Sequence, residues 1–331
     1  MKLEARIPVR IDFGGPWTDT PEFYVNEPEG GATLNAAIVP LLPNAMGQYR
    51  QAYVRGTLTT GGSLVNAKEI IVSGPSGNLR EKLVRGIGVS YEAGIPSSGL
   101  GTSAALNALW LGLIKGINED ISSPENRQLI AEKAHRIERE LGIIGGKQDQ
   151  YAAVFGGINL FVFHQDGSVD IRKVQIPESS LQELRKSLIL FDTGETRLSS
   201  RLHEYVWGNY RKGLNRAPLV RMREIAFEMF DCLADGDLES FGYLMNENWE
   251  CQKALHQSIT NERIEDIFEV VKRVGVLGGK ACGAGGGGCL VFLTEPERRK
   301  QVEGVLSNLP GVIVQFEFDW DGLLVERVEE E

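Results

Sequence analysis

The sequence predicts an α+β fold with two domains. Its 331 residues exceed the size at which one hydrophobic core usually keeps growing, so two domains of about 150 residues each are expected. Apolar segments with strand periodicity and segments with helical periodicity are mixed along the chain, which is typical of an α+β sandwich. The chain turns polar around residues 165–187, and we place the boundary there, between residues 1–175 and residues 176–331.

The composition argues against several classes of protein. The 35 basic and 45 acidic residues give a formal net charge of -10, and no Lys/Arg block could follow a nucleic-acid backbone. No segment approaches the roughly 18 apolar residues of a membrane span, and the N-terminus lacks the apolar core of a signal peptide. The four cysteines are far apart and lack Cys-x-x-Cys spacing, which disfavours disulfides and zinc. We therefore expect a cytoplasmic protein without nucleic-acid or membrane partners.

In the first half of the chain, strand and helix signals alternate with glycine-rich loops. Residues 5–13 alternate as a strand before glycine and proline break the pattern. Residues 103–114 predict a helix, and residues 124–141 predict a second helix with Ser123 as its N-cap. The apolar segment 158–163 predicts a short strand that follows them.

In the second half, helices alternate with short strands around a glycine run. The expected helices cover about residues 198–233, 237–255, 262–274 and 296–307, and the expected strands cover residues 188–192, 289–293 and 312–319.

The loop "PSSGLGTSAAL", residues 96–106, leads directly into the first predicted helix. The start of a helix has unpaired N–H groups and partial positive charge, and both favour a bound phosphate. Gly99 and Gly101 let the backbone approach such a ligand, while the hydroxyls of Thr102 and Ser103 can donate to phosphate oxygens or ligate magnesium. The loop predicts a nucleotide phosphate site, although a Ser/Gly linker with an N-cap would have the same composition.

The second glycine cluster, "GAGGGG" at residues 283–288, formally matches G-x-G-x-x-G. It lies between a predicted helix and a predicted strand, which is the reverse of the order that a dinucleotide site requires. We therefore reject a Rossmann site. Two interpretations stay open: a tight turn crowded against another part of the backbone, and a loop that backs the phosphate site or the acceptor.

Four charged residues are candidates for a functional site. Asp149 and Asp19 follow glycine-rich loops, where each could be catalytic or could cap a helix. Glu138 belongs to the amphipathic helix, where a solvated face is the default. Arg10 lies in an apolar strand and should have an anionic partner, either a carboxylate or a substrate phosphate, because an unpaired buried charge is costly.

Three blocks taken together resemble the motifs of the GHMP small-molecule kinases, the family of galactokinase, homoserine kinase and mevalonate kinase. They are "ARIPVRIDFGGPWTDTPEF", "PSSGLGTSAAL" and "GKACGAGGGGCLVFL", and they span residues 5–293 in the family's order and spacing. The resemblance implies an N-terminal domain of the ribosomal protein S5 type, a ferredoxin-like C-terminal domain and an active site between them. It also implies ATP and Mg²⁺ as cofactors.

The resemblance further assigns expected roles to residues of each block. Asp149 matches the residue that contacts the acceptor hydroxyl, and Arg10 matches its basic partner; these are the expected catalytic residues. Ser103 and Glu138 match the magnesium ligands. The expected nucleotide-binding residues are Pro96, Ser97, Ser98, Gly99, Leu100, Gly101, Thr102, Ser103 and Ala104, and the expected sugar-binding residues are Asp19, Trp17, Thr18, Gly285 and Gly286.

Shorter segments resemble the sugar-kinase branch of this family. The two kinds of sugar kinase that they resemble phosphorylate the anomeric hydroxyl of a sugar. "WTDTPEF", "TGETR" and "NWECQKAL" look like L-fucose kinases, whereas "ERELGIIGGKQDQYAAVFGG" looks at least as much like D-glycero-D-manno-heptose 7-phosphate kinases. The heptose enzymes usually have a third glycine and no tryptophan before the Thr-Asp pair. Pro16 and Trp17 therefore favour an L-fucose-like acceptor, with the heptose 7-phosphate as the alternative.

The sequence disfavours two other functions. A sugar- and ATP-binding regulator without catalysis is disfavoured by the intact candidates at Arg10, Ser103, Glu138 and Asp149. An isoprenoid kinase or diphosphomevalonate decarboxylase is disfavoured because the loop at residues 14–30 is acidic, whereas a diphosphate acceptor calls for basic residues. The sequence leaves the oligomeric state open, a homodimer included.

Overall fold

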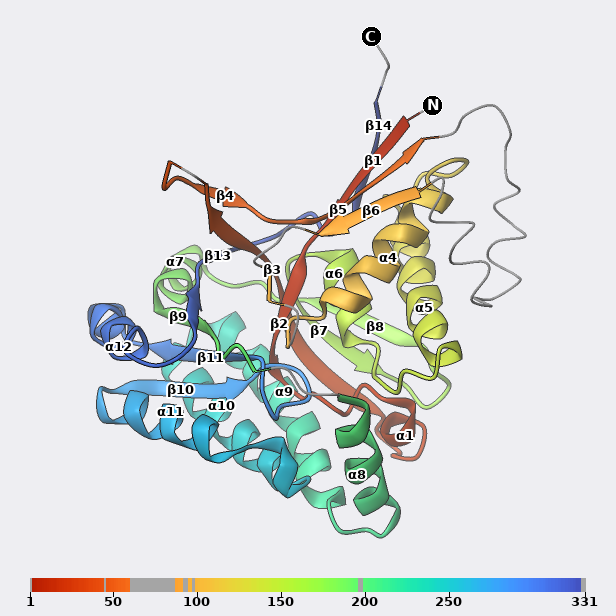
Figure 1. Ribbon diagram of the computed structural model, residues 1–331. Helices are drawn as coiled ribbons and strands as arrows, with labels where there is room; N and C mark the ends of the chain where they lie inside the picture. The colour runs from red at the N-terminus through yellow and green to blue at the C-terminus, as the bar shows by residue number, and fades with distance from the viewer. Residues whose placement is uncertain are drawn as a thin grey trace.

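The computed structural model describes residues 2–44, 46–59, 87–91, 95–96, 99–195 and 199–328, and Figure 1 shows their arrangement. Within these ranges the strands form three sheets, and helices pack on each. In Figure 1 the strands near both chain ends lie at the top, and most helices of the second half lie at the bottom. None of the helices described is long and apolar enough to cross a membrane.

The first sheet has the strand order β14-β1-β5-β6, and helix α4 packs against it. Its strands are all antiparallel, and the first residues of the chain pair with the last ones, Lys2 with Val328. The elements are β1 (Lys2–Ile7), β5 (Val54–Thr59), β6 (Ile87–Tyr91), β14 (Leu324–Val328) and α4 (Thr102–Lys115).

The second sheet has the order β13-β3-β7-β8, and β2 and β4 also pair with the long strand β3. Helix α6 packs on β2 and β3, and α5 covers α4 and α6. The elements are β2 (Val9–Gly14), α1 (Pro21–Tyr24), β3 (Gly31–Pro43), β4 (Tyr49–Gln51), α5 (Pro124–Glu140), α6 (Gln148–Phe155), β7 (Ile158–Phe163), β8 (Val169–Lys173) and β13 (Phe316–Phe318).

The third sheet, with the order β10-β11-β9-β12, belongs to the second half of the chain. Helices α9 and α10 pack against each other; α10 contacts β10, and α9 contacts β2 and β3. The elements are α7 (Glu178–Ser187), β9 (Leu188–Asp192), α8 (Ser199–Arg211), α9 (Arg216–Asp235), α10 (Leu238–Lys253), α11 (Glu262–Arg273), β10 (Val276–Ala281), β11 (Cys289–Thr294), α12 (Arg299–Leu306) and β12 (Val312–Val314). Two 3₁₀ turns, η1 (Gln257–Ile259) and η2 (Pro296–Arg298), precede α11 and α12.

Two predicted elements are divided in the structure. The predicted strand 5–13 is interrupted at Pro8, which has no N–H for a ladder, so β1 and β2 enter different sheets. The predicted helix 198–233 is interrupted around Gly213, whose φ of 72° is unfavourable in a helix, and becomes α8 and α9. The segment 312–319 likewise divides into β12 and β13, which lie in different sheets.

The two halves of the chain share one core. Phe13 of β2 packs on Phe241 of α10, with ring centroids 5.2 Å apart, and both side chains belong to a cluster that also contains Val291 of β11. A second cluster surrounds Trp17, Trp207 and Trp249. Because β2 packs against elements of both halves of the chain, the loop that follows it has a fixed position relative to the second half of the chain. The domain boundary at residue 175 stays a prediction.

Candidate active site

A cavity of about 590 Å³ opens between the two halves of the chain. Most of its lining comes from four segments: the loop after β2, the start of α4, the loop between α5 and α6, and the glycine loop between β10 and β11; side chains of β2, α5, α6 and α8 complete it. The predicted site residues that line it are Arg10, Trp17, Asp19, Gly99, Gly101, Thr102, Ser103, Ala104, Glu138, Asp149 and Gly285. Three blocks that are far apart in the sequence therefore meet at one cavity.

The start of α4 faces this cavity. Its N-cap is Gly101, which has a left-handed φ of 71°, and no side chain caps the helix. Thr102, Ser103 and Ala104 form the first turn and line the cavity. The N–H groups of that turn lack intrahelical partners, so the arrangement suits an anion such as a phosphate. Thr102 uses its own hydroxyl to donate to the carbonyl of Pro96 at 3.0 Å.

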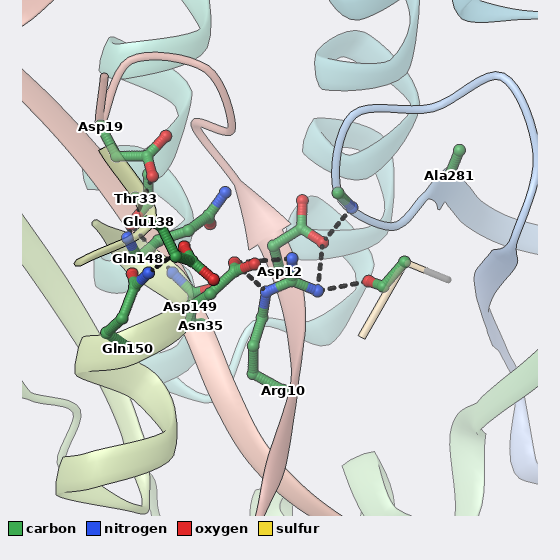
Figure 2. Close-up of polar contacts among 12 residues, drawn as sticks. Arg10, Asp12, Asp19, Thr33, Asn35, Glu138, Gln148, Asp149, Gln150 and Ala281 are labelled. Carbon is green, nitrogen blue, oxygen red and sulfur yellow. Dashed lines mark hydrogen bonds and ion pairs between the residues drawn. The ribbon is translucent and has the colours of Figure 1, made fainter. Parts of the chain in front are cut away.

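Arg10 and Asp149 form an ion pair at the centre of the cavity (Figure 2). Nε and NH2 of Arg10 lie 2.8 Å and 2.7 Å from Oδ1 of Asp149. NH1 donates to the carbonyl of Gly99 and lies 3.6 Å from Oδ1 of Asp12. Arg10 is 3% exposed, and the anionic partner that its apolar strand called for is thus a carboxylate. Oδ2 of Asp149 is left outside this pair.

Gly101 brings the phosphate loop into contact with Asp149. A Cβ built on Gly101 would lie 3.1 Å from Cβ, Cγ and Oδ2 of Asp149. Asp149 lies in the first turn of α6, whose N-cap is Lys147. Asp149 therefore does not cap α6, and its carboxylate faces the N-terminus of α4.

Glu138 faces the cavity although it lies on an amphipathic helix, and it is 8% exposed. Nδ2 of Asn107 on α4 and Nε2 of Gln150 on α6 donate to its two oxygens at 3.1 Å and 2.6 Å. Burial, and then the charge of Asp149, raise the pKa of Glu138 to about 7. The solvated-face interpretation of this residue is wrong.

Asp19 is also buried, at 2% exposed, and its pKa is raised to about 7, mainly by burial. The backbone N–H of Gln148 donates to its Oδ2 at 3.0 Å. Gly146 makes room for this carboxylate, since a Cβ there would lie 1.8 Å from Oδ2 of Asp19. The N-cap of α1 is Thr20, so Asp19 does not cap that helix.

Four predicted site residues lie away from the cavity lining. Thr18 is buried, and its hydroxyl lies 2.8 Å from the carbonyl oxygens of both Gly15 and Ala32, to which its single proton can donate in turn; this shapes the loop. Leu100 is buried in the core, the backbone N–H of Gly286 donates to Ile259, and Pro96 accepts from Thr102. The remaining two predicted residues, Ser97 and Ser98, are outside the described residues.

A buried ion pair behind the cavity was missed by sequence reasoning. Nζ of Lys280 lies 2.7 Å from Oδ2 of Asp12, and both side chains have no exposed surface. Oδ1 of Asp12 accepts from the backbone N–H of Gly283 at 2.7 Å, which holds the glycine loop against β2. The signal was available: Lys280 and Asp12 are charges within apolar strands, as Arg10 is, and each needs a partner.

His203 on α8 also lines the cavity and was not predicted. Its ring centroid lies 4.5 Å from that of Trp17, and Nε1 of Trp207 donates to its Nδ1 at 3.3 Å. Burial lowers the pKa of His203 to about 4, so the ring is neutral near pH 7.

The oxygen ligands that line the cavity suit a magnesium ion bound together with a nucleotide. The hydroxyl of Ser103 and the carboxylate of Glu138 are hard oxygen ligands that line the same cavity, and Glu138 forms a side-chain hydrogen bond with Ser103. Mg²⁺ typically binds proteins through one or two such ligands and fills the other positions with water and phosphate oxygens.

Comparisons with known proteins agree with this geometry. The family model for the N-terminal domain of GHMP kinases matches residues 71–157, and the model for the C-terminal part of GHMP kinases matches residues 229–310. A D-glycero-alpha-D-manno-heptose 7-phosphate kinase from Campylobacter jejuni is 30% identical over 71% of this chain and 69% of its own length.

Two further relatives are similar over most of the chain. A bifunctional fucokinase/GDP-fucose pyrophosphorylase from Arabidopsis thaliana is 27% identical over 93% of this chain, which spans 31% of that longer protein. The crystal structure of a D-glycero-D-manno-heptose 1-phosphate kinase from Bacteroides thetaiotaomicron matches with a TM-score of 0.67 and 23% identity, over 99% of this chain and 100% of the other. At that identity the structural match supports the two-domain fold.

Proposed function

The chain belongs to the GHMP kinases, phosphotransferases that act on an alcohol group, and on that premise we propose that it transfers the γ-phosphoryl group of ATP to the anomeric hydroxyl of a monosaccharide. The observation that carries the proposal is the Arg10–Asp149 pair, 2.7 Å between NH2 and Oδ1, beside the uncapped start of α4. Phosphoryl transfer needs positioned partners and compensated charge, and these groups supply both.

In this proposal the transfer is direct and in line. The backbone N–H groups of Gly101, Thr102 and Ser103 bind the phosphates, and the acceptor hydroxyl hydrogen-bonds to Asp149, which takes or orients its proton. Arg10 offsets the negative charge that moves with the γ-phosphoryl group. Ser103 and Glu138 would hold Mg²⁺, whose role is to neutralise charge on the phosphates.

The acceptor end of the cavity favours a sugar without a charge of its own. Among the lining residues that the structure describes, Arg10 is the one Lys or Arg, whereas Asp19, Glu138 and Asp149 are acidic. Ile143 and Ile144 add apolar surface beside Trp17. A neutral 6-deoxy sugar such as L-fucose suits this lining, and we propose it as the acceptor type.

The alternative acceptor is D-glycero-D-manno-heptose 7-phosphate. The 30% identity to the Campylobacter jejuni kinase favours it. A sugar that carries a phosphate needs a cation at the far end of its site, and the described lining offers none beyond Arg10. This contrast makes the two acceptors separable by experiment.

We propose a cytoplasmic location for the enzyme.

A phosphate-transfer screen tests the proposal. The protein is incubated with Mg-ATP and L-fucose, heptose 7-phosphate, D-galactose or D-mannose, ADP release is measured, and ³¹P NMR locates the new phosphate. The proposal expects a 1-phosphate and the highest kcat/KM with L-fucose. Turnover with heptose 7-phosphate alone would contradict the neutral acceptor, and ATP binding without transfer to any sugar would indicate a regulator that lacks catalysis.

A further inference from the structure

Trp17 is held in a costly conformation at the edge of the cavity. Its φ of 75° is the one positive value among the described residues other than glycine, and its indole N–H is buried without a partner. Bulky side chains rarely adopt this backbone region. Such strain persists only where the surroundings enforce it, and it gathers at functional sites. The conformation turns the indole toward the second half of the chain, where its ring contacts those of His203 and Trp207.

Helix α8, which carries His203, is fixed against the loop that carries Trp17. The buried carboxylate of Glu27 accepts from the hydroxyl of Tyr210 at 2.7 Å, and Arg216 at the start of α9 donates to the two oxygens of that carboxylate at 2.8 Å and 2.6 Å. Phe23 of α1 packs on Tyr210 with ring centroids 5.9 Å apart. Figure 1 shows α1 and α8 as neighbours at the lower right. His203 therefore has a fixed position relative to Trp17.

The hydrogen bond from Trp207 determines which nitrogen of His203 carries the proton. An indole N–H can only donate, so Nδ1 of His203 must be the acceptor and is unprotonated. The neutral ring then has its proton on Nε2. Within the described part of the chain, Nε2 has no hydrogen-bond partner, and His203 lines the cavity. The ring thus offers one oriented N–H donor beside the indole of Trp17.

We propose that His203 is a specificity-determining residue: its Nε2–H donates to a hydroxyl of the acceptor whose apolar face packs on Trp17. This inference rests on the proposed sugar-kinase function. It adds a side-chain contact from α8 in the second half of the chain to an acceptor site in which Asp19 and Asp149 come from the first half. A sugar hydroxyl can accept such a bond, and an aromatic face suits the C–H side of a pyranose ring.

Matched variants of His203 test the contact. His203→Phe keeps a ring against Trp17 and removes the donor, whereas His203→Gln restores a donor at the reach of Nε2. We expect His203→Phe to weaken sugar binding about tenfold, as for the loss of one hydrogen bond, with an unchanged Kd for Mg-AMPPNP. We expect His203→Gln to recover most of the loss. His256→Phe is the control, because His256 also accepts at Nδ1 and stacks on Tyr205 but does not line the cavity.

Deoxy sugars identify the hydroxyl that His203 contacts. Binding of L-fucose and its 2-, 3- and 4-deoxy analogues is measured by calorimetry for the wild type and His203→Phe. Removing the contacted hydroxyl should weaken binding to the wild type about tenfold and should hardly affect the variant. Equal losses in both proteins for every analogue, or wild-type affinity in His203→Phe, would overturn the inference.

Calorimetry also separates this inference from the proposed function. If the wild type binds and phosphorylates a sugar but His203→Phe binds it equally well, the inference alone is wrong. If a sugar binds without being phosphorylated and His203→Phe loses affinity, the inference stands and the kinase proposal is wrong. If none of L-fucose, heptose 7-phosphate, D-galactose and D-mannose binds to the wild type, both are overturned.

Discussion

Lys280 donates to Asp12 across the two halves of the chain, with Nζ 2.7 Å from Oδ2 and neither side chain exposed. The ammonium also donates to the carbonyls of Asp12 and Ala281, at 2.9 Å and 2.8 Å. Because Asp12 also accepts from Gly283 and lies 3.6 Å from Arg10, this pair connects the glycine loop to the arginine that holds Asp149.

Removing one partner of this pair should destabilise the protein. We expect Lys280→Met to lower the free energy of unfolding by about 3 kcal/mol, because it leaves a buried carboxylate without its main counter-charge. The double variant Asp12→Asn/Lys280→Met should lose less than Lys280→Met, since the asparagine can still accept from Gly283. Urea unfolding measures both, and Lys300→Met, at an exposed position on α12, is the control. A double variant that is less stable than Lys280→Met would contradict the coupling.

Asp149 should matter for turnover more than for nucleotide binding. In Asp149→Asn, Arg10 keeps its contacts with Gly99 and Asp12, so the site should stay folded. We expect kcat to fall by about a hundredfold or more, the usual size of a general-base contribution, and the Kd for Mg-AMPPNP to stay within about threefold. Coupled ADP-release kinetics measure the former, with Asp231→Asn at an exposed position on α9 as the control. Wild-type turnover in Asp149→Asn would exclude this role.

Nucleotide binding should release protons from Glu138. With a pKa raised to about 7, this carboxyl is protonated below pH 7 in the free protein, and a bound magnesium ion requires the carboxylate. At pH 6.5 about three-quarters of the molecules would carry this proton, so Mg-AMPPNP should release more protons from the wild type than from Glu138→Gln. The affinity of the wild type should fall as the pH drops below 7.

Calorimetry in buffers of different ionisation enthalpy measures that release. Glu140→Gln serves as the control, because Glu140 lies on the same helix, is half exposed and pairs with Arg136 outside the cavity. Equal proton release by the wild type and by Glu138→Gln would show that Glu138 does not hold the ion.

Two adjacent glycines should respond differently to an added methyl group. A Cβ at Gly146 would lie 1.8 Å from Oδ2 of Asp19, whereas nothing lies within 4 Å of one at Gly145. We expect Gly146→Ala to displace Asp19 and to raise the KM for the sugar about tenfold, in line with the cost of overpacking, with little change in the KM for ATP. Gly145→Ala should behave like the wild type in the same steady-state assay. Similar sugar KM values for the two variants would exclude Asp19 from acceptor binding.

Local chemistry predicted much of this fold and of its cavity. The helices at 102–115 and 124–140 lie where apolar spacing and caps predicted them. "GAGGGG" is a turn that lacks the dinucleotide geometry, but it joins the strands β10 and β11, so the prediction that a helix comes directly before it is wrong. Contacts between segments that are far apart in the sequence were harder to predict. Helical spacing indicated a solvated face for Glu138, and only the packing of α4 and α6 on α5 reveals its burial.

The missed site residues share one physical cause. Asp12 and Lys280 are 268 positions apart, and His203 lies on α8, which contacts the first half of the chain through the hydrogen bond from Tyr210 to Glu27. The local sequence around these residues does not show that they come together in space. The useful local signal is the cost of burying a charge, which correctly predicted an anionic partner for Arg10 and would have led to Lys280 by the same reasoning.

The antiparallel register of β1 with β14, from Lys2 opposite Val328 to Arg6 opposite Leu324, has a consequence for biosynthesis. Strand β1 is synthesised long before β14, so one of its edges stays unpaired until residues 324–328 emerge, and β3 likewise waits for Phe316–Phe318. The nascent first half cannot complete its sheets as an independent unit, so these sheets become complete only once residues 316–328 have been synthesised.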